Sequence, residues 1–108
     1  MFSYYKDREP VEMLPGVTRQ MLSCGERAMT VYIDVKKGCE VPLHNHPHEQ
    51  IGYLQKGRCR FRIGDEERVL EALDGYAIPG GVMHGVAALE DCVFVDVFSP
   101  IRDEYKQD

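Results

Sequence analysis

The chain has 108 residues, which is enough for one domain and too few for a second hydrophobic core. Its hydrophobic fraction of 44% and charged fraction of 29% are close to the averages of globular proteins, which argues against a disordered or membrane-embedded chain. The formal net charge is −5, and the Lys and Arg residues are scattered among acidic residues, so we expect no nucleic-acid partner.

The N-terminal segment predicts neither a secretory signal nor a membrane anchor. Residues 1–16 hold no apolar run of the required length, so we expect a cytoplasmic protein with no membrane partner. Pro10 and the pair Pro15-Gly16 interrupt this polar segment, and we predict an N-terminal arm of residues 1–16 and one barrel domain of residues 17–108. The four Cys residues form no C-x-x-C pair, and we expect free thiols in a reducing compartment.

Short strands follow one another between residues 29 and 99. Residues 29–35 alternate between apolar and polar side chains, as in a strand with one buried face. Further strands are predicted at residues 50–55, 58–63, 68–73, 82–89 and 93–99 and just before Pro79. Gly and Pro turns separate these strands, and no helical periodicity is present, which predicts an all-β barrel or jelly roll.

Histidines two residues apart indicate a metal site. On a strand, His44 and His46 project from the same face, and His84 adds a third imidazole from a distant predicted strand. Three imidazoles that converge inside a barrel can hold one divalent metal ion. Neutral imidazole binds Zn, Ni, Fe, Mn and Cu to varying degrees, so these residues leave the identity of the metal open.

The spacing of glycines and histidines resembles that of the cupin family. Gly38, His44-Asn45-His46, Gln50 and Gly57 are spaced as in the first cupin motif, with Gln50 at the position where the motif usually has Glu. Residues 79–84, Pro-Gly-Gly-Val-Met-His, resemble the second motif. The resemblance covers roughly residues 28–98 and implies an all-β cupin fold, the double-stranded β-helix or jelly-roll barrel, in a single domain.

The same resemblance implies the metal ligands, which are His44, His46, Gln50 and His84. Glu49 is the nearest carboxylate, but on a continuing strand it points to the opposite face from Gln50. His48 lies outside the cupin register, and we expect it in solvent or beside the ligands. A shell of neutral ligands leaves the ion its full double charge, which favours Lewis-acid chemistry over redox chemistry.

The last predicted strand places an acid between two aromatic residues. Phe94, Asp96 and Phe98 share one face of this strand. Burial raises the pKa of a carboxyl group towards values useful for proton transfer, so Asp96 is a candidate general acid or base. Asp96 at a wet barrel mouth, or paired with an Arg, is the alternative interpretation, and Phe98 is by default a core residue.

The C-terminal residues carry a second resemblance. Residues 96–105, Asp-Val-Phe-Ser-Pro-Ile-Arg-Asp-Glu-Tyr, resemble the signature of the KdgF-type pectin-degradation cupins, which also have Gln in the first motif. Those single-domain proteins are usually dimeric and convert cyclic 4,5-unsaturated uronates, released by pectin or alginate lyases, into open-chain keto sugars. The resemblance implies that the functional Asp, Phe and Arg of that family correspond to Asp96, Phe98 and Arg102.

We therefore expect a metal-dependent enzyme of isomerase or lyase type whose substrate is a small anionic sugar. Asp96 is the predicted acid/base, Arg102 the clamp for the substrate carboxylate, and Phe98 a surface for the sugar ring. The alternatives are a mononuclear metal dioxygenase of the cupin class, a non-catalytic sugar-binding cupin, and a structural protein with a vestigial site. Open sheet edges and the N-terminal arm favour a homodimer.

Overall fold

The computed structural model describes residues 1–107, so Asp108, which ends the predicted domain 17–108, lies outside the described residues. Two short 3-10 helices, η1 (Tyr5–Asp7) and η2 (Asp103–Tyr105), flank the strands. No helix in this described part is long and apolar enough to cross a lipid bilayer. The strands are β1 (Val11–Leu14), β2 (Val17–Cys24), β3 (Met29–Val35), β4 (Glu40–His44), β5 (Glu49–Lys56), β6 (Arg58–Ile63), β7 (Glu66–Glu71), β8 (Gly75–Ile78), β9 (His84–Ala88) and β10 (Cys92–Ser99).

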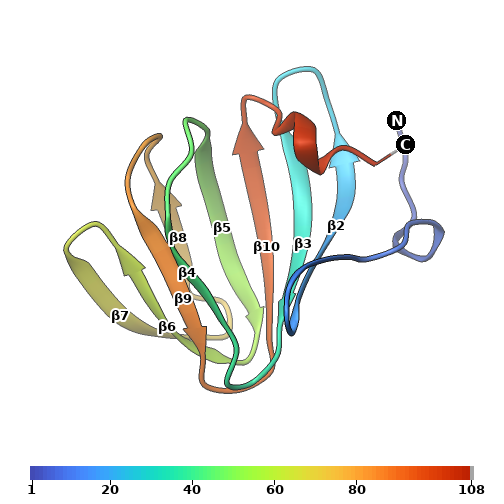
Figure 1. Ribbon diagram of the computed structural model, residues 1–108. Helices are drawn as coiled ribbons and strands as arrows, with labels where there is room; N and C mark the ends of the chain where they lie inside the picture. Colours follow the sequence, from blue (N-terminus) through green and yellow to red (C-terminus); the bar gives the residue numbers. More distant parts are fainter. Residues whose placement is uncertain (108) are drawn as a thin grey trace.

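These strands form two antiparallel sheets that face each other (Figure 1). Within residues 1–107, the larger sheet has the order β1-β2-β3-β10-β5-β8, and the smaller sheet has the order β4-β9-β6-β7. Strands that are distant in the sequence pair directly, since β10 lies between β3 and β5, and β9 lies between β4 and β6. The fold is therefore the predicted all-β jelly roll.

The strands with a regular alternation form where the sequence predicts them. The predicted strands 29–35 and 58–63 coincide with β3 and β6. In β10, Phe94, Asp96 and Phe98 are buried while Val97 is exposed, so the acid lies on the inner face of the larger sheet. The period of two thus assigns the inner faces of these strands correctly.

Strands β1 and β2 and the first residues of β4 were not predicted. The side chains of β2 and β4 do not alternate regularly, whereas β1 alternates over four residues only. A bulge between Met21 and Ser23 shifts the register of β2, so that Gln20 and Met21 are both buried. In β4, Pro42 and the apolar Leu43 are exposed. Strand β1 lies inside the predicted arm and pairs with β2 at the edge of the larger sheet. The division into arm and domain stays a prediction.

Two apolar clusters form the core. The main cluster lies between the sheets and contains Val17, Val35, Leu54, Cys59, Phe61, Ile78, Ala88, Cys92 and Phe94. The second cluster joins Met21, Met29 and Val31 to Phe98 and to Tyr105 of η2. The burial of Tyr105 against this second cluster fixes the C-terminal segment at the end of the sandwich. The Tyr105 ring lies there beside Phe98, near the C-terminal end of β10.

We expect Leu54→Ala to lower the free energy of unfolding by about 2–5 kcal/mol, because Leu54 is fully buried in the main cluster and its truncation leaves a cavity. Ile51→Ala, on the outer face of the same strand where Ile51 is 48% exposed, should change it by less than about 1 kcal/mol. Urea denaturation of both variants measures the difference. Equal losses would contradict the assignment of the inner face of β5.

Candidate metal centre

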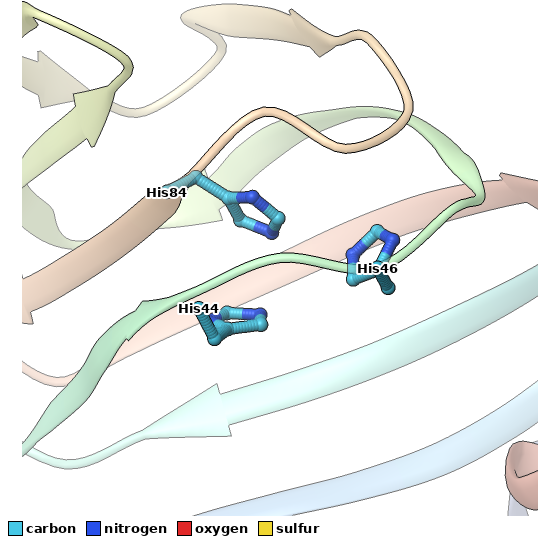
Figure 2. Close-up of side chains that lie close together, drawn as sticks. All are labelled: His44, His46 and His84. Atoms are coloured by element: carbon cyan, nitrogen blue, oxygen red, sulfur yellow. The ribbon is translucent and has the colours of Figure 1, made fainter.

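Three imidazoles converge between the two sheets (Figure 2). His44 ends β4 and is the register partner of His84, which begins β9 on the neighbouring strand. One ring nitrogen each of His44, His46 and His84 lies within 4.8 Å of the others. The ring centroids of His44 and His84 are 4.3 Å apart, and those of His46 and His84 are 4.9 Å apart. The structure thus brings the three predicted histidine ligands together.

His46 belongs to this cluster but does not lie on the predicted strand. The sequence analysis placed His44 and His46 on one continuous strand, which is wrong because β4 ends at His44 and the chain turns before β5 begins. His46 lies in this turn, and its Nδ1 bonds to the backbone oxygen of His48 at 3.1 Å. The turn, rather than a strand, therefore aims the imidazole of His46.

The Nδ1 atoms of all three imidazoles are held by the backbone. A carbonyl oxygen only accepts hydrogen bonds, so each Nδ1 carries the hydrogen and each Nε2 keeps its lone pair. Backbone contacts of this kind fix the tautomer and orient metal-binding imidazoles. The three bonds join His44 Nδ1 to Pro42 O (2.9 Å), His46 Nδ1 to His48 O (3.1 Å) and His84 Nδ1 to Val82 O (2.9 Å).

Two observations show that these residues fit a metal ion. The Nε2 atom of His84 is buried and has no hydrogen-bond partner among residues 1–107, which is costly unless an ion or another ligand satisfies it. The Nε2 of His46 lies 3.0 Å from Oε1 of Gln50. Both of these atoms are acceptors in the neutral tautomer assigned above, and a cation between two acceptors removes their repulsion. The donor set of three imidazoles and an amide oxygen suits a divalent ion.

Burial favours the neutral imidazoles of His46 and His84, and the neutral ring is the form that binds metals. Burial lowers the pKa of His84 to about 4, despite the opposing effect of the hydrogen bond to Val82. Burial, followed by the positive charge of Arg102, lowers the pKa of His46 as well. The loss of hydration disfavours the charged imidazolium ring, and the nearby guanidinium group repels it.

The neighbours of Gln50 take no part in this cluster. Glu49 is exposed, whereas Gln50 on the same strand is buried, so the carboxylate points away from the histidines as predicted. His48 is half-buried and does not belong to the group of converging nitrogens. Whether Gln50 ligates a metal stays a prediction, but its position inside the sandwich is the one that a ligand needs.

One cavity between the sheets unites the predicted metal ligands and the predicted catalytic residues. Three of the four predicted metal ligands, His44, Gln50 and His84, line it. Residues from both the centre of the larger sheet and the C-terminal segment complete it, among them Asp96, Phe98 and Arg102. Residues that are more than fifty positions apart in the sequence thus face a common space.

Asp96 is the buried acid of this cavity. Only 2% of its surface is exposed, so the alternative of a wet barrel mouth is excluded, and no ion pair with an Arg is formed in the described chain. Burial raises the pKa of Asp96 to about 6, and hydrogen bonds from Tyr76 and Gln50 partly oppose this rise. A carboxyl group with this pKa exchanges protons readily near neutral pH.

Tyr76 is a cavity residue that the sequence analysis did not assign. Its hydroxyl donates a hydrogen bond to Oδ1 of Asp96 at 2.5 Å. Burial, together with the nearby carboxylate, raises the pKa of Tyr76, so the phenol keeps its proton. Tyr53 and Met83 are 39% and 44% exposed and do not line the cavity.

Arg102 is folded back over the cavity. Its guanidinium carbon lies 3.9 Å from the ring centroid of Tyr105 and 5.1 Å from that of Phe98. Only 13% of the side chain is exposed, so Arg102 is not a solvated residue of the C-terminal tail. Nε bonds to Glu104 at 2.9 Å, and the two terminal nitrogens make no hydrogen bond within residues 1–107. These nitrogens are the anion-binding edge of a guanidinium group.

We expect Gln50→Ala to weaken the binding of a divalent metal by at least about tenfold, because it removes the amide oxygen beside His46. Glu49→Ala should leave the affinity unchanged, since this carboxylate is exposed on the outer face. Isothermal titration calorimetry of the metal-free proteins with Zn²⁺ or Mn²⁺ compares the metal affinities of the two variants. His84→Ala is the reference for the loss of a ligand. Equal affinities for Gln50→Ala and the unmodified chain would remove Gln50 from the ligand set.

His84 in the metal-free protein should titrate near pH 4 instead of 6.5, because burial disfavours its charged form. Between pH 6.5 and about 4 the folded state then binds fewer protons than the unfolded state. The stability associated with neutral His84 is therefore complete above pH 6.5 and is lost as the pH falls towards 4. Nitrogen-15 NMR of the imidazole rings gives the midpoint, and a value near 6.5 would contradict the burial of this ring.

Comparison with known proteins gives a family and several solved relatives. Residues 31–98 match the cupin domain family. KdgF from Halomonas sp. is 30% identical, with a TM-score of 0.91 over 98% of both chains. An RmlC-like cupin from Shewanella frigidimarina is 31% identical, with a TM-score of 0.92 over 97% of this chain and 95% of that one.

More distant relatives share the fold alone. An oxalate decarboxylase variant from Bacillus subtilis is 22% identical, with a TM-score of 0.82 over 96% of this chain and 30% of the larger protein. No curated protein sequence matches the chain. Because the family match spans most of the chain and the two relatives of 30% and 31% identity match over nearly their whole length, this chain belongs to the cupin family and is a small, single-domain cupin that resembles KdgF.

Proposed function

We propose that this cupin is an enzyme that opens the ring of 4,5-unsaturated uronates and releases the linear keto sugar. The observation that carries the proposal is the shared cavity, in which a histidine cluster, a buried carboxyl group and a guanidinium group face one another. The resemblance of residues 96–105 to the KdgF-type signature and the identity of 30% to KdgF from Halomonas sp. support the same class of substrate.

Arg102 suits the carboxylate of a uronate. Glu104 occupies Nε of its guanidinium group, which leaves the terminal nitrogens free for a bidentate pair with a planar carboxylate. Stacking on Tyr105 holds the guanidinium plane, so little side-chain freedom is lost when an anion binds. Phe98 lies beside this group and offers an apolar face to the C–H side of a sugar ring.

Asp96 suits the proton transfers of the reaction. Ring opening is an isomerisation in which the C1 hydroxyl loses its proton while the bond between C1 and the ring oxygen breaks. The ring oxygen leaves as the enolate oxygen at C5, and this enolate becomes a ketone when C4 gains a proton, so atoms and electrons balance without an oxidant. A carboxyl group with a pKa of about 6 can accept the first proton and deliver the second near neutral pH.

The histidine cluster suits the electrophilic part of the reaction. A divalent ion held by His44, His46, Gln50 and His84 supplies Lewis-acid polarisation of a substrate oxygen. The backbone carbonyls that hold the three Nδ1 atoms keep the imidazoles in place before a substrate arrives. Since the exposed Glu49 is excluded from the cluster, the two-His-one-carboxylate arrangement of an iron oxygenase is not favoured.

Proton NMR tests the proposal directly. We expect the metal-loaded protein to accelerate loss of the vinyl signal of a 4,5-unsaturated galacturonate monomer, and we expect a chelator to abolish the acceleration. Asp96→Asn should lower kcat by at least about 100-fold because it removes the proton-transfer group. Arg102→Gln should mainly raise KM, by about tenfold or more, because it removes the partner of the substrate carboxylate.

Asp65→Asn and Arg68→Gln are matched controls, since both side chains are exposed far from the cavity in the turn before β7 and on β7. Binding of the uronate without turnover would favour the non-catalytic sugar-binding cupin. If the metal-loaded protein neither binds nor converts the uronate, the proposal is wrong. Oxygen uptake with bound Fe would then support the dioxygenase alternative.

A further inference from the structure

A phenol and a carboxyl group meet across an intervening strand of the larger sheet. Asp96 lies on β10 and Tyr76 on β8, and β5 runs between these two strands. Gly52 of β5 is the register partner of both residues. Neighbouring strands are separated by about 4.8 Å, so the backbones of β8 and β10 lie roughly 10 Å apart, and the contact depends on the length of the tyrosine side chain.

Gly52 leaves the space through which this contact is made. A Cβ atom at position 52 would lie 2.1 Å from Oδ1 of Asp96 and 2.9 Å from the hydroxyl of Tyr76, and 2.7 Å from the carbonyl oxygen of Val95. Any side chain at this position would therefore separate the phenol from the carboxyl group. The φ angle of Gly52 is not positive, so the requirement for glycine here comes from this close approach and not from the backbone conformation.

We propose that Tyr76 is a positioning residue whose hydroxyl, reaching over Gly52, holds the Asp96 side chain in the one rotamer that presents its carboxyl group to the substrate cavity. This role rests on the ring-opening function proposed above. Tyr76 donates to Oδ1, which anchors the carboxyl group where Asp96 lines the cavity. Carboxyl groups that act in proton transfer lose efficiency when they are misplaced by even about 1 Å.

The hydroxyl of Tyr76 is separable from the packing of its ring. The ring lies 4.4 Å from that of Phe61 and 6.4 Å from that of Phe94, and these apolar contacts remain when Tyr is replaced by Phe. Asp96 is the hydrogen-bond partner of the hydroxyl within residues 1–107. Tyr76→Phe therefore removes the hold on the carboxyl group and leaves the core contacts of the ring in place.

The carboxyl group is held from two directions, and only one of them is independent of the metal site. Gln50, a predicted metal ligand two residues before Gly52 on the same strand, is the other hydrogen-bond partner of Asp96. Without the phenol, the carboxyl group depends on a residue whose orientation the metal site also determines. Tyr76 is not a predicted metal ligand, so its hold on Asp96 does not depend on the metal site.

The test compares the kinetics of Tyr76→Phe in two backgrounds. In the otherwise unmodified, metal-loaded protein, we expect kcat on the unsaturated uronate to fall by about ten- to one-hundred-fold, with KM changed by less than about twofold. In the Asp96→Asn background, Tyr76→Phe should have no further effect, because it acts only through the carboxyl group. Tyr53→Phe, an exposed phenol on β5, is the matched control.

A measurement without substrate separates this inference from the proposed function. In the folded protein, NMR couplings of Asp96 should show one χ1 rotamer, and Tyr76→Phe should replace it by an average over several. A fixed rotamer in Tyr76→Phe would overturn the inference, whether or not the protein turns over uronates. An unchanged kcat in Tyr76→Phe would also overturn the inference. So would a loss of kcat in the Asp96→Asn background equal to the loss that Tyr76→Phe causes in the otherwise unmodified protein. Rotamer averaging in a protein that is inactive on uronates would contradict only the proposed function.

Discussion

A polar group in a dry interior needs a partner, and this requirement organises the centre of the sandwich. Among the described residues the buried polar side chains are Gln20, His46, Gln50, His84 and Asp96. Four of these five surround one cavity or its histidine cluster. Backbone carbonyls satisfy the Nδ1 atoms, Tyr76 satisfies one carboxyl oxygen, and Nε2 of His84 is left for an ion. The fold thus provides partners for the polar atoms named here, and the exception is an imidazole nitrogen of a residue that lines the cavity.

The sequence predicts the parts of this arrangement that depend on local periodicity. Alternation along a single strand was enough to predict that Asp96 and Phe98 lie on an inner face. The spacing of the motifs was enough to predict that the imidazoles of His44 and His84 lie close together. The contact of Tyr76 with Asp96 was not predictable in this way, because it depends on the register of three strands and on a glycine in the middle one. The register of paired strands depends on residues of several strands, so the sequence of one strand does not predict it.

The position of Arg102 illustrates the same limit. The sequence places it beyond a proline, where a tail residue and a substrate clamp look alike. In the structure, Tyr105 packs against Phe98 at the end of the second apolar cluster, and the guanidinium group stacks on both rings. A core contact made three residues later in the chain therefore determines where the cation lies. The proposed anion site and the end of the hydrophobic core therefore form one structural unit.

The backbone bonds to the three Nδ1 atoms have a consequence for the exchange of metal ions. A ligand that must lose a proton before it coordinates makes metal uptake release acid and depend on pH. Here the tautomers leave each Nε2 without a hydrogen, and burial lowers the pKa of His46 and lowers that of His84 to about 4, which favours the neutral rings. For these two ligands, uptake of an ion in a neutral solution is close to proton-neutral. One divalent ion can then replace another without changing the protonation of the ligands, and the choice of metal is left to ion size and supply.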